Sequence, residues 1–119
     1  MIQAQSESQL QAECVRYMRN VLSVVYGTFF SVPNEGKRSP VNASRMIAQG
    51  LLAGIPDLVW CRNAQVVFFE LKTTKGKLSA KQKLIHENLK TEGFEVYVVK
   101  SFEEFKNIVT LILKTNPKK

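Results

Sequence analysis

Residues 54–72 read GIPDLVWCRNAQVVFFELK. Two apolar, β-branched and aromatic runs in this stretch flank a short polar turn at 62–64, which is the pattern of a β-hairpin. We therefore expect antiparallel strands at 55–61 and 65–72. The second run is apolar on both faces, at Val66-Val67-Phe68-Phe69, so this strand is expected to be buried on both sides of a sheet.

Charged residues stand at one end of the predicted hairpin. Asp57 opens the first strand, and Glu70 and Lys72 close the second. Because residues i and i+2 of a strand share a face, Glu70 and Lys72 point the same way. The hairpin returns the chain, so Glu70 can lie beside Asp57. Charges flanked by buried apolar residues need partners, and we expect two carboxylates and an ammonium group to form one site.

Such a set has the chemistry of phosphodiester hydrolysis. Two carboxylates can hold a hard divalent cation such as Mg²⁺, which lowers the pKa of a bound water and shields charge developing on phosphorus. A neighbouring lysine can orient or deprotonate the attacking water, or stabilise the developing charge. The alternative interpretations are a turn-capping aspartate and a solvent-facing Glu–Lys pair on an edge strand. The apolar residues around both positions weaken these alternatives.

A helix is predicted over residues 6–26, ending at Gly27. Its apolar stripe repeats at steps of three and four residues: Leu10, Cys14, Met18, Val21, Leu22 and Val25. At about 100° per residue, Glu7 falls within the arc of this stripe. Glu7 is therefore expected to be an inward-facing carboxylate that needs a compensating partner.

The remaining patterns complete an α/β domain. They predict a strand at 28–32, a helix at 42–53, a helix at 79–92, a strand at 94–99 and a helix at 101–114. Ser79 with Gln82 forms a capping-box pattern, and Gly93 is placed to end that helix. The order α-β-α-β-β-α-β-α indicates a mixed sheet flanked by helices. A chain of 119 residues and 13.5 kDa is expected to form one domain over residues 1–119.

Composition narrows the function. The chain has 17 Lys and Arg against 10 Asp and Glu, a net charge of +7, which suits a polyanionic partner. No apolar run approaches the roughly 18 residues of a membrane span, and the first residues do not resemble a secretory signal, so we expect a cytoplasmic protein. Cys14 and Cys61 stand far apart, and His86 is the single histidine, which argues against a zinc site. We expect two free buried thiols, a packed or surface His86, and Trp60 in the core.

Basic residues form two groups that could contact phosphates. The first follows the predicted active-site strand, and the second includes a polar loop bracketed by Pro33 and Pro40. The candidate DNA-binding residues are Asn34, Lys37, Arg38, Arg45, Lys75, Lys77 and Lys81. A solvated charged face is the alternative for any one of them. No known base-reading motif is present, which favours recognition of DNA by shape and backbone.

The chain resembles a known family. Gly54-Ile55-Pro56-Asp57, twelve residues, and then Glu70-Leu71-Lys72 resemble the PD-(D/E)XK nuclease motif. The wider series resembles the stand-alone VRR-NUC domains of phage and bacterial genomes: Ser6-Glu7-x-Gln9-Leu10-Gln11, Pro33-Asn34-Glu35-Gly36-Lys37-Arg38, Arg45, Gly50, Phe69 to Thr73, and Gly76-x-Leu78-Ser79-x-x-Gln82. Glu35 departs from the glycine that is usual in the family's polar loop.

The resemblance implies a restriction-endonuclease-like fold and roles for particular residues. Asp57 and Glu70 would be metal ligands, with the Leu71 carbonyl as a third, for Mg²⁺ or alternatively Mn²⁺. Lys72 would be the catalytic lysine, and Glu7 the acid of the first helix. Gln82 would lie near the site, although a capping role alone is the alternative. No organic cofactor is expected.

The same resemblance implies a Mg²⁺-dependent, structure-specific DNA endonuclease in a bacterial or phage-infected cell. A homodimer that resolves Holliday junctions in DNA repair is the first expectation, because two sites would then face two strands. A related nuclease acting on flaps or linear duplex, of repair or restriction type, is the second. A DNA-binding module without catalysis is the third.

Overall fold

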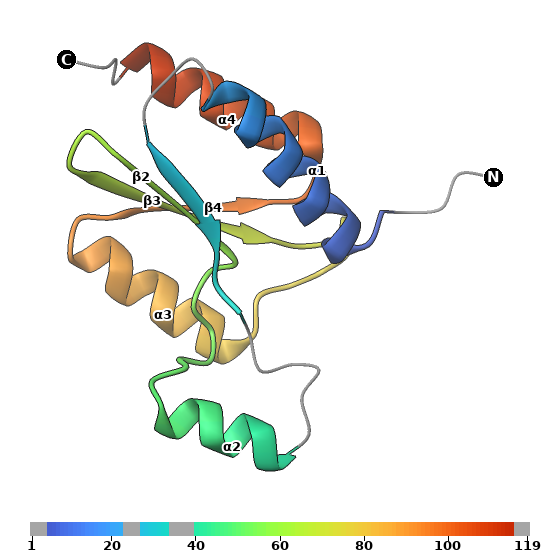
Figure 1. The fold of residues 1–119 in the computed structure, drawn as a ribbon, viewed down its shortest axis with the longest axis vertical. Helices are drawn as coiled ribbons and strands as arrows, with labels where there is room; N and C mark the ends of the chain where they lie inside the picture. The colour runs from blue at the N-terminus through green and yellow to red at the C-terminus, as the bar shows by residue number, and fades with distance from the viewer. Residues whose placement is uncertain (1–4, 23–26, 34–39, 116–119) are drawn as a thin grey trace.

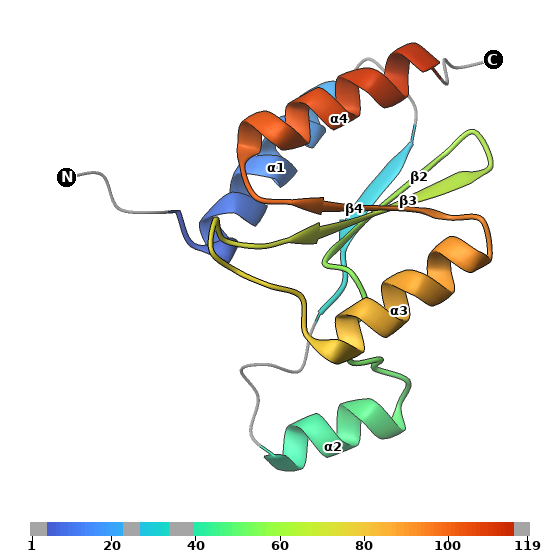
Figure 2. The same cartoon turned by 180° about the vertical axis from the view of Figure 1, so that it is seen from behind.

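The computed structural model describes residues 5–22, 27–33 and 40–115. Within these ranges a mixed four-stranded sheet has α1 and α4 on one face and α3 on the other (Figures 1 and 2). The elements are α1 (Glu7–Val21), β1 (Thr28–Ser31), α2 (Pro40–Ala48), β2 (Leu58–Arg62), β3 (Gln65–Leu71), α3 (Ala80–Thr91), β4 (Glu95–Val99) and α4 (Phe102–Thr115). The predicted fold class and element order are confirmed. No helix in the described ranges is both long and apolar enough to cross a membrane.

The predicted hairpin is the centre of the sheet, whose strand order is β1-β2-β3-β4. β2 pairs antiparallel with β1 and with β3, whereas β3 and β4 are parallel and are joined through α3. Asn63 and Ala64 form the hairpin turn with φ of 51° and 62°, as a two-residue type I′ turn requires. Leu58 is opposite Phe69, so the same register brings Asp57 opposite Glu70.

The core lies between the sheet and the α1–α4 face. Its largest members are Trp60, which is 1% exposed, Phe69 and Phe105, so the prediction that Trp60 is a core residue is confirmed. The apolar stripe of α1 enters this core through Leu10, Cys14 and Met18. Cys14 and Cys61 are free thiols. Cys14 is buried as expected, whereas Cys61 is half-buried.

Several predicted boundaries differ from the structure, most of all those of α1, β2 and α2. α1 ends at Val21, with Leu22 as its C-cap, rather than at 26; residues 23–26 lie outside the described ranges. β2 begins at Leu58 rather than at 55, because Pro56 has no N–H to donate to a strand ladder.

α2 spans Pro40–Ala48 rather than the predicted 42–53. Proline is favoured in the first turn of a helix, where its missing N–H is not needed. The helix ends in a Schellman motif, in which Gly50 N–H donates to Ile47 and Leu51 N–H donates to Met46. Gly50 has a φ of +109°, a left-handed conformation that glycine adopts readily at the end of a helix.

The start of α3 is held by the predicted capping box. The Ser79 hydroxyl accepts from Gln82 N–H, and the Gln82 side chain accepts from Ser79 N–H. The loop before β2 packs directly against this first turn. A Cβ built on Gly54, whose φ is +89°, would lie 2.9 Å from the Lys81 carbonyl carbon and oxygen. Glycine is therefore required where this loop meets α3.

Replacing Gly54 by alanine is expected to lower the melting temperature by more than about 5 °C, because the new Cβ would collide with the Lys81 backbone. Gly93→Ala is the matched control: its φ is +98°, but no atom lies within 4 Å of the added Cβ. Both variants introduce backbone strain, and only Gly54→Ala introduces the collision. Thermal melts followed by circular dichroism measure this difference. Equal losses of stability in the two variants would contradict the close contact between Gly54 and Lys81.

Candidate active site

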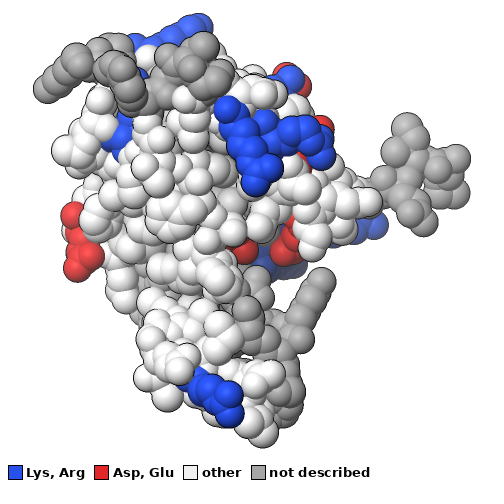
Figure 3. Space-filling view, in the orientation of Figure 1, with Lys and Arg blue, Asp and Glu red and all other residues white. Residues whose placement is uncertain are grey.

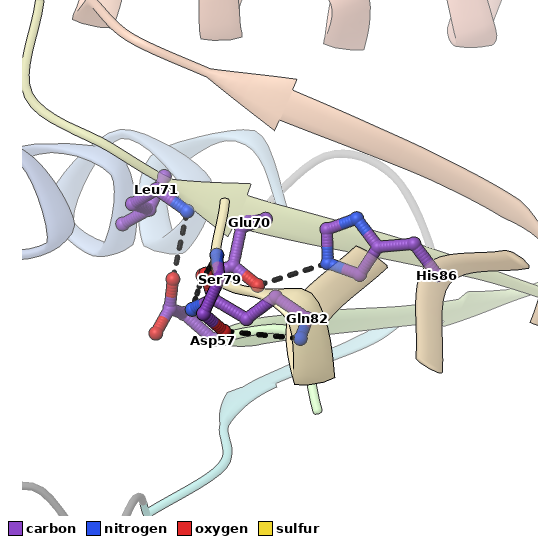
Figure 4. Close-up of polar contacts among 6 residues, drawn as sticks. All are labelled: Asp57, Glu70, Leu71, Ser79, Gln82 and His86. Atoms are coloured by element: carbon purple, nitrogen blue, oxygen red, sulfur yellow. Dashed lines mark hydrogen bonds and ion pairs between the residues drawn. The ribbon is translucent and has the colours of Figure 1, made fainter. Parts of the chain in front are cut away.

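The candidate site lies at the end of the sheet where β3 stops and β2 begins. Asp57 precedes β2, and Glu70 is the penultimate residue of β3. Glu70 is only 2% exposed and Asp57 is half-buried. The two side chains line one hollow, and the N-terminal turn of α3 lies beside them (Figure 4). The prediction that the hairpin brings these carboxylates together is confirmed by the strand register.

A backbone hydrogen bond orients the Asp57 carboxylate. Its Oδ2 atom accepts from Leu71 N–H at 2.7 Å (Figure 4). Because β2 begins only at Leu58, it offers no strand partner this far along β3. The aspartate side chain therefore takes the place of a ladder carbonyl, and a charged acceptor makes this a strong hydrogen bond.

Two side chains of α3 hold the two oxygens of Glu70. His86 Nε2 lies 3.0 Å from Glu70 Oε1, and Gln82 Nε2 donates to Glu70 Oε2 at 3.3 Å (Figure 4). Residues four apart on a helix project on the same side, so one face of α3 supplies both contacts. Gln82 also accepts the Ser79 N–H; it is thus at once a capping residue and a neighbour of the site.

His86 is a site residue that the sequence interpretation missed. A packed histidine was one of the two expectations, and His86 is indeed buried, at 4% exposure, but its partner is Glu70. The signal in the sequence is the spacing of Gln82 and His86, which places both on one helical face. That this face meets Glu70, and not another part of the sheet, follows only from the packing of α3.

Burial controls the protonation of this cluster. It raises the pKa of Glu70 to about 9, and the adjacent Asp57 adds to the effect, while Lys72 opposes it in part. Burial also lowers the pKa of His86 from its usual value, and Lys90 contributes to that. At neutral pH, with no cation bound, Glu70 therefore retains a proton and His86 is neutral.

Glu7 and Lys72 complete the cluster from its solvent side. Glu7 is exposed, so the prediction of a buried Glu7 is wrong. Helical periodicity gave the direction of Glu7 correctly, but the first turn of α1 lies at the end of the sheet (Figure 1), and there the side chain is exposed. Glu7 lines the same two hollows as Asp57. Lys72 is half-buried; within the described ranges it forms no ion pair, although its charge acts on Glu70.

The donor set fits a hard cation. Asp57 faces two hollows of about 320 Å³ each, and Glu70 and Leu71 each line one of them. No group of three His, Cys, Asp or Glu side chains that could hold a metal occurs among the described residues, so this is not the pattern of a zinc centre. Mg²⁺ commonly uses one or two carboxylates and keeps several waters. A buried carboxyl group whose pKa is strongly raised is ionised once such a cation is bound.

The predicted DNA-binding residues that the structure describes are spread over the surface. Lys81 lines the hollow next to Glu70, and Lys75 and Lys77 are exposed between β3 and α3. Arg45 is exposed on α2, which stands away from the sheet beyond α3 (Figures 1 and 2). The remaining three, Asn34, Lys37 and Arg38, lie outside the described residues.

Comparison with known proteins gives a consistent result. The family model of the VRR-NUC domain matches residues 6–103. A solved structure described as "VRR_NUC domain protein" superposes with a TM-score of 0.76 at 17% identity, over 98% of this chain and 95% of the other. A second, described as "VRR_NUC domain", has a TM-score of 0.58 at 19% identity, over 89% and 97%. At these identities the two structures establish the fold. No curated protein matches the chain.

Glu70→Gln is expected to raise the melting temperature of the metal-free protein at pH 8 by about 5 °C or more. The pKa of Glu70 is about 9 in the folded state and 4.5 as a free side chain. The protonated Glu70 side chain therefore makes its full contribution to the free energy of unfolding below pH 4.5, and this contribution is lost as the pH rises through 9. The difference in melting temperature between variant and wild type should grow from pH 5 to pH 9 in EDTA.

Adding Mg²⁺ at pH 8 provides the matching control. The wild type should gain stability, because the cation favours the ionised carboxylate, and Glu70→Gln should gain much less. A difference in melting temperature that does not change with pH would contradict the raised pKa of Glu70.

Proposed function

Since the chain belongs to the VRR-NUC domain family, a family of nuclease-type domains that act on DNA, we propose that it is a Mg²⁺-dependent endonuclease that hydrolyses phosphodiester bonds. The observation that carries this proposal is that Asp57 and the buried Glu70 line one hollow at the end of the central hairpin. Folding two carboxylates together is unfavourable, and a bound divalent cation removes the penalty.

Asp57 and Glu70 would hold the cation, with the Leu71 carbonyl as a further ligand. When bound, Mg²⁺ supplies Lewis-acid activation of the phosphodiester and shields its developing charge. Hydrogen bonds within the chain orient these ligands before a cation binds. Leu71 N–H fixes the Asp57 carboxylate, while Gln82 and His86 fix that of Glu70. Ligands that are already oriented need little rearrangement as the reaction proceeds.

Lys72 and Glu7 would act on the open side of the site. Lys72 is half-buried and its charge reaches Glu70, so its ammonium group can donate to the attacking water or to a non-bridging phosphate oxygen. Glu7 is exposed beside Asp57, where its carboxylate can accept a hydrogen bond from a water molecule and so position it.

The proposed substrate is branched DNA, with a four-way junction cut by a homodimer. A small chain offers little surface for a branched substrate, and two copies would present two sites to two strands. Exposed apolar side chains on and after α2, namely Val41, Ile47 and Leu52, support an interface between copies. A dimer should show twice the 13.5 kDa mass of the chain in light scattering.

Asp57→Asn and Lys72→Met are each expected to reduce DNA cleavage in Mg²⁺ by at least about a hundredfold, because one removes a carboxylate ligand and the other removes the ammonium group. The assay uses labelled four-way junction, splayed arm, flap and linear duplex. Lys114→Met is the matched control: Lys114 is an exposed lysine in the last turn of α4, and its loss should leave cleavage intact.

The substrate panel separates the proposals. Paired symmetric cuts restricted to the junction support a dimeric resolvase. Cuts in flaps or duplex that are lost in both variants would support the proposed hydrolytic mechanism and exclude a junction-specific resolvase. Salt-sensitive DNA binding without any cleavage in Mg²⁺ or Mn²⁺ would indicate a DNA-binding module without catalysis.

His86→Ala is expected to raise the Mg²⁺ concentration for half-maximal cleavage about tenfold, because Glu70 loses one of its two partners on α3. His86→Gln, which can still donate a hydrogen bond, should recover part of the loss. Mg²⁺ titrations at fixed DNA concentration measure this. A normal Mg²⁺ requirement in His86→Ala would show that His86 only fills space.

A further inference from the structure

Three hollows on the surface form a continuous series through the candidate site. The first lies against α3 and includes Glu70 and Lys81. The second lies against α1 and shares Glu7 and Asp57 with the first. The third has a volume of about 420 Å³ and shares Ser8 and Gln11 with the second. A path therefore runs from the start of α3, past the carboxylates, and along the outer face of α1.

We name the third hollow the α1 groove; it is lined by Ser8, Gln11, Ala12, Val15, Arg16 and Arg19. Its floor has short side chains near the carboxylates, and its far end has two arginines. Ser8, Ala12, Val15 and Arg19 follow one another at steps of four, three and four residues, so they form one stripe along the helix. Ser8, Ala12 and Arg19 are exposed, on the side of the helix opposite the buried Leu10, Cys14 and Met18, whereas Val15 packs at the edge of the core.

Charge is arranged along this path in a way that suits a polyanion. Arg16 and Arg19 are exposed, and neither is engaged in an ion pair in the part of the chain that the structure describes. Figure 3 shows basic atoms gathered over α1 and acidic atoms in the depression below them, on the same face. Lys81 stands at the other end of the path. The carboxylates repel phosphate groups, so cations on both sides are needed to hold a phosphodiester chain over them.

The length of the groove matches several nucleotides. Arg16 and Arg19 are eight and eleven residues beyond Ser8, which is about 12 and 16 Å along a helix that rises 1.5 Å per residue. B-form DNA rises about 3.4 Å per nucleotide along its axis, so these arginines lie about three to five nucleotide steps beyond Ser8, which lines a hollow with Asp57. Their guanidinium groups are well suited to paired hydrogen bonds with phosphate.

We infer that the α1 groove binds the sugar-phosphate backbone of DNA on one side of the scissile phosphodiester, with Arg16 and Arg19 as its phosphate contacts. This inference rests on the proposed function and deepens it, because it defines the direction in which the substrate leaves the site. The contacts are to backbone, so they operate on any base sequence.

The test is the double variant Arg16→Gln/Arg19→Gln in an Asp57→Asn background, with binding to junction and duplex DNA measured by fluorescence anisotropy from 50 to 300 mM KCl. Loss of two phosphate contacts should weaken binding about tenfold at moderate salt and reduce the slope of log K against log salt by nearly two. With Asp57 intact, cleavage at subsaturating DNA should fall by a similar factor. Arg16→Lys/Arg19→Lys should retain most of the affinity.

Lys90→Gln/Lys114→Gln is the matched control. It removes the same total charge from the last turns of α3 and α4 and should change the salt slope much less. Equal effects of the two double variants would overturn the inference, since net charge alone would then explain binding. An unchanged affinity in the arginine variant would also overturn it.

Failure of the proposed function has a different signature. In that case the wild type binds DNA but cuts none of the four substrates, while the salt slope still decides whether Arg16 and Arg19 contact phosphates. A wild type that does not bind DNA would overturn the inference as well as the proposed function.

Discussion

The antiparallel pairing of β2 with β3 forces one carboxylate into the interior of this protein. With Leu58 opposite Phe69, Asp57 has no place except beside Glu70. The strand register is itself held by apolar side chains such as Trp60, Val67 and Phe69, because a shift of one residue would turn every one of them to the opposite face. The packing of the core is thus what keeps these two carboxyl groups side by side.

The rest of the architecture supplies the groups that make this arrangement tolerable. β3 and β4 are parallel, so the chain must cross over between them, and the crossover is α3. The helix covers the sheet face to which Glu70 points, and it places Gln82 and His86 on the two oxygens of that side chain. One connection therefore satisfies the topology of the sheet and the hydrogen-bonding needs of the buried carboxyl group.

The proposed function requires an acidic site to accept an anionic substrate, and the arrangement of the helices addresses this conflict. α1 and α3 lie on opposite faces of the sheet (Figure 2), and both begin near the end that carries Asp57 and Glu70. Each brings basic residues to its own side of the carboxylates, Lys81 from α3 and Arg16 with Arg19 from α1. In the proposed function, the flanking basic residues would attract phosphate, and the central carboxylates would bind the cation.

The sequence by itself determined the order of elements, the central hairpin, the capping box at Ser79 and the pairing of Asp57 with Glu70, because each depends on residues close together along the chain or joined by one tight turn. The sequence could not determine how far each carboxylate is buried. Helical periodicity gives the direction of Glu7 but not whether anything covers it, and Glu7 is exposed while Glu70 is buried. Only the tertiary structure brought His86 to Glu70 and joined the groove of Arg16 and Arg19 to the site. Those contacts are between segments whose relative positions are set by packing across the sheet, which no local pattern encodes.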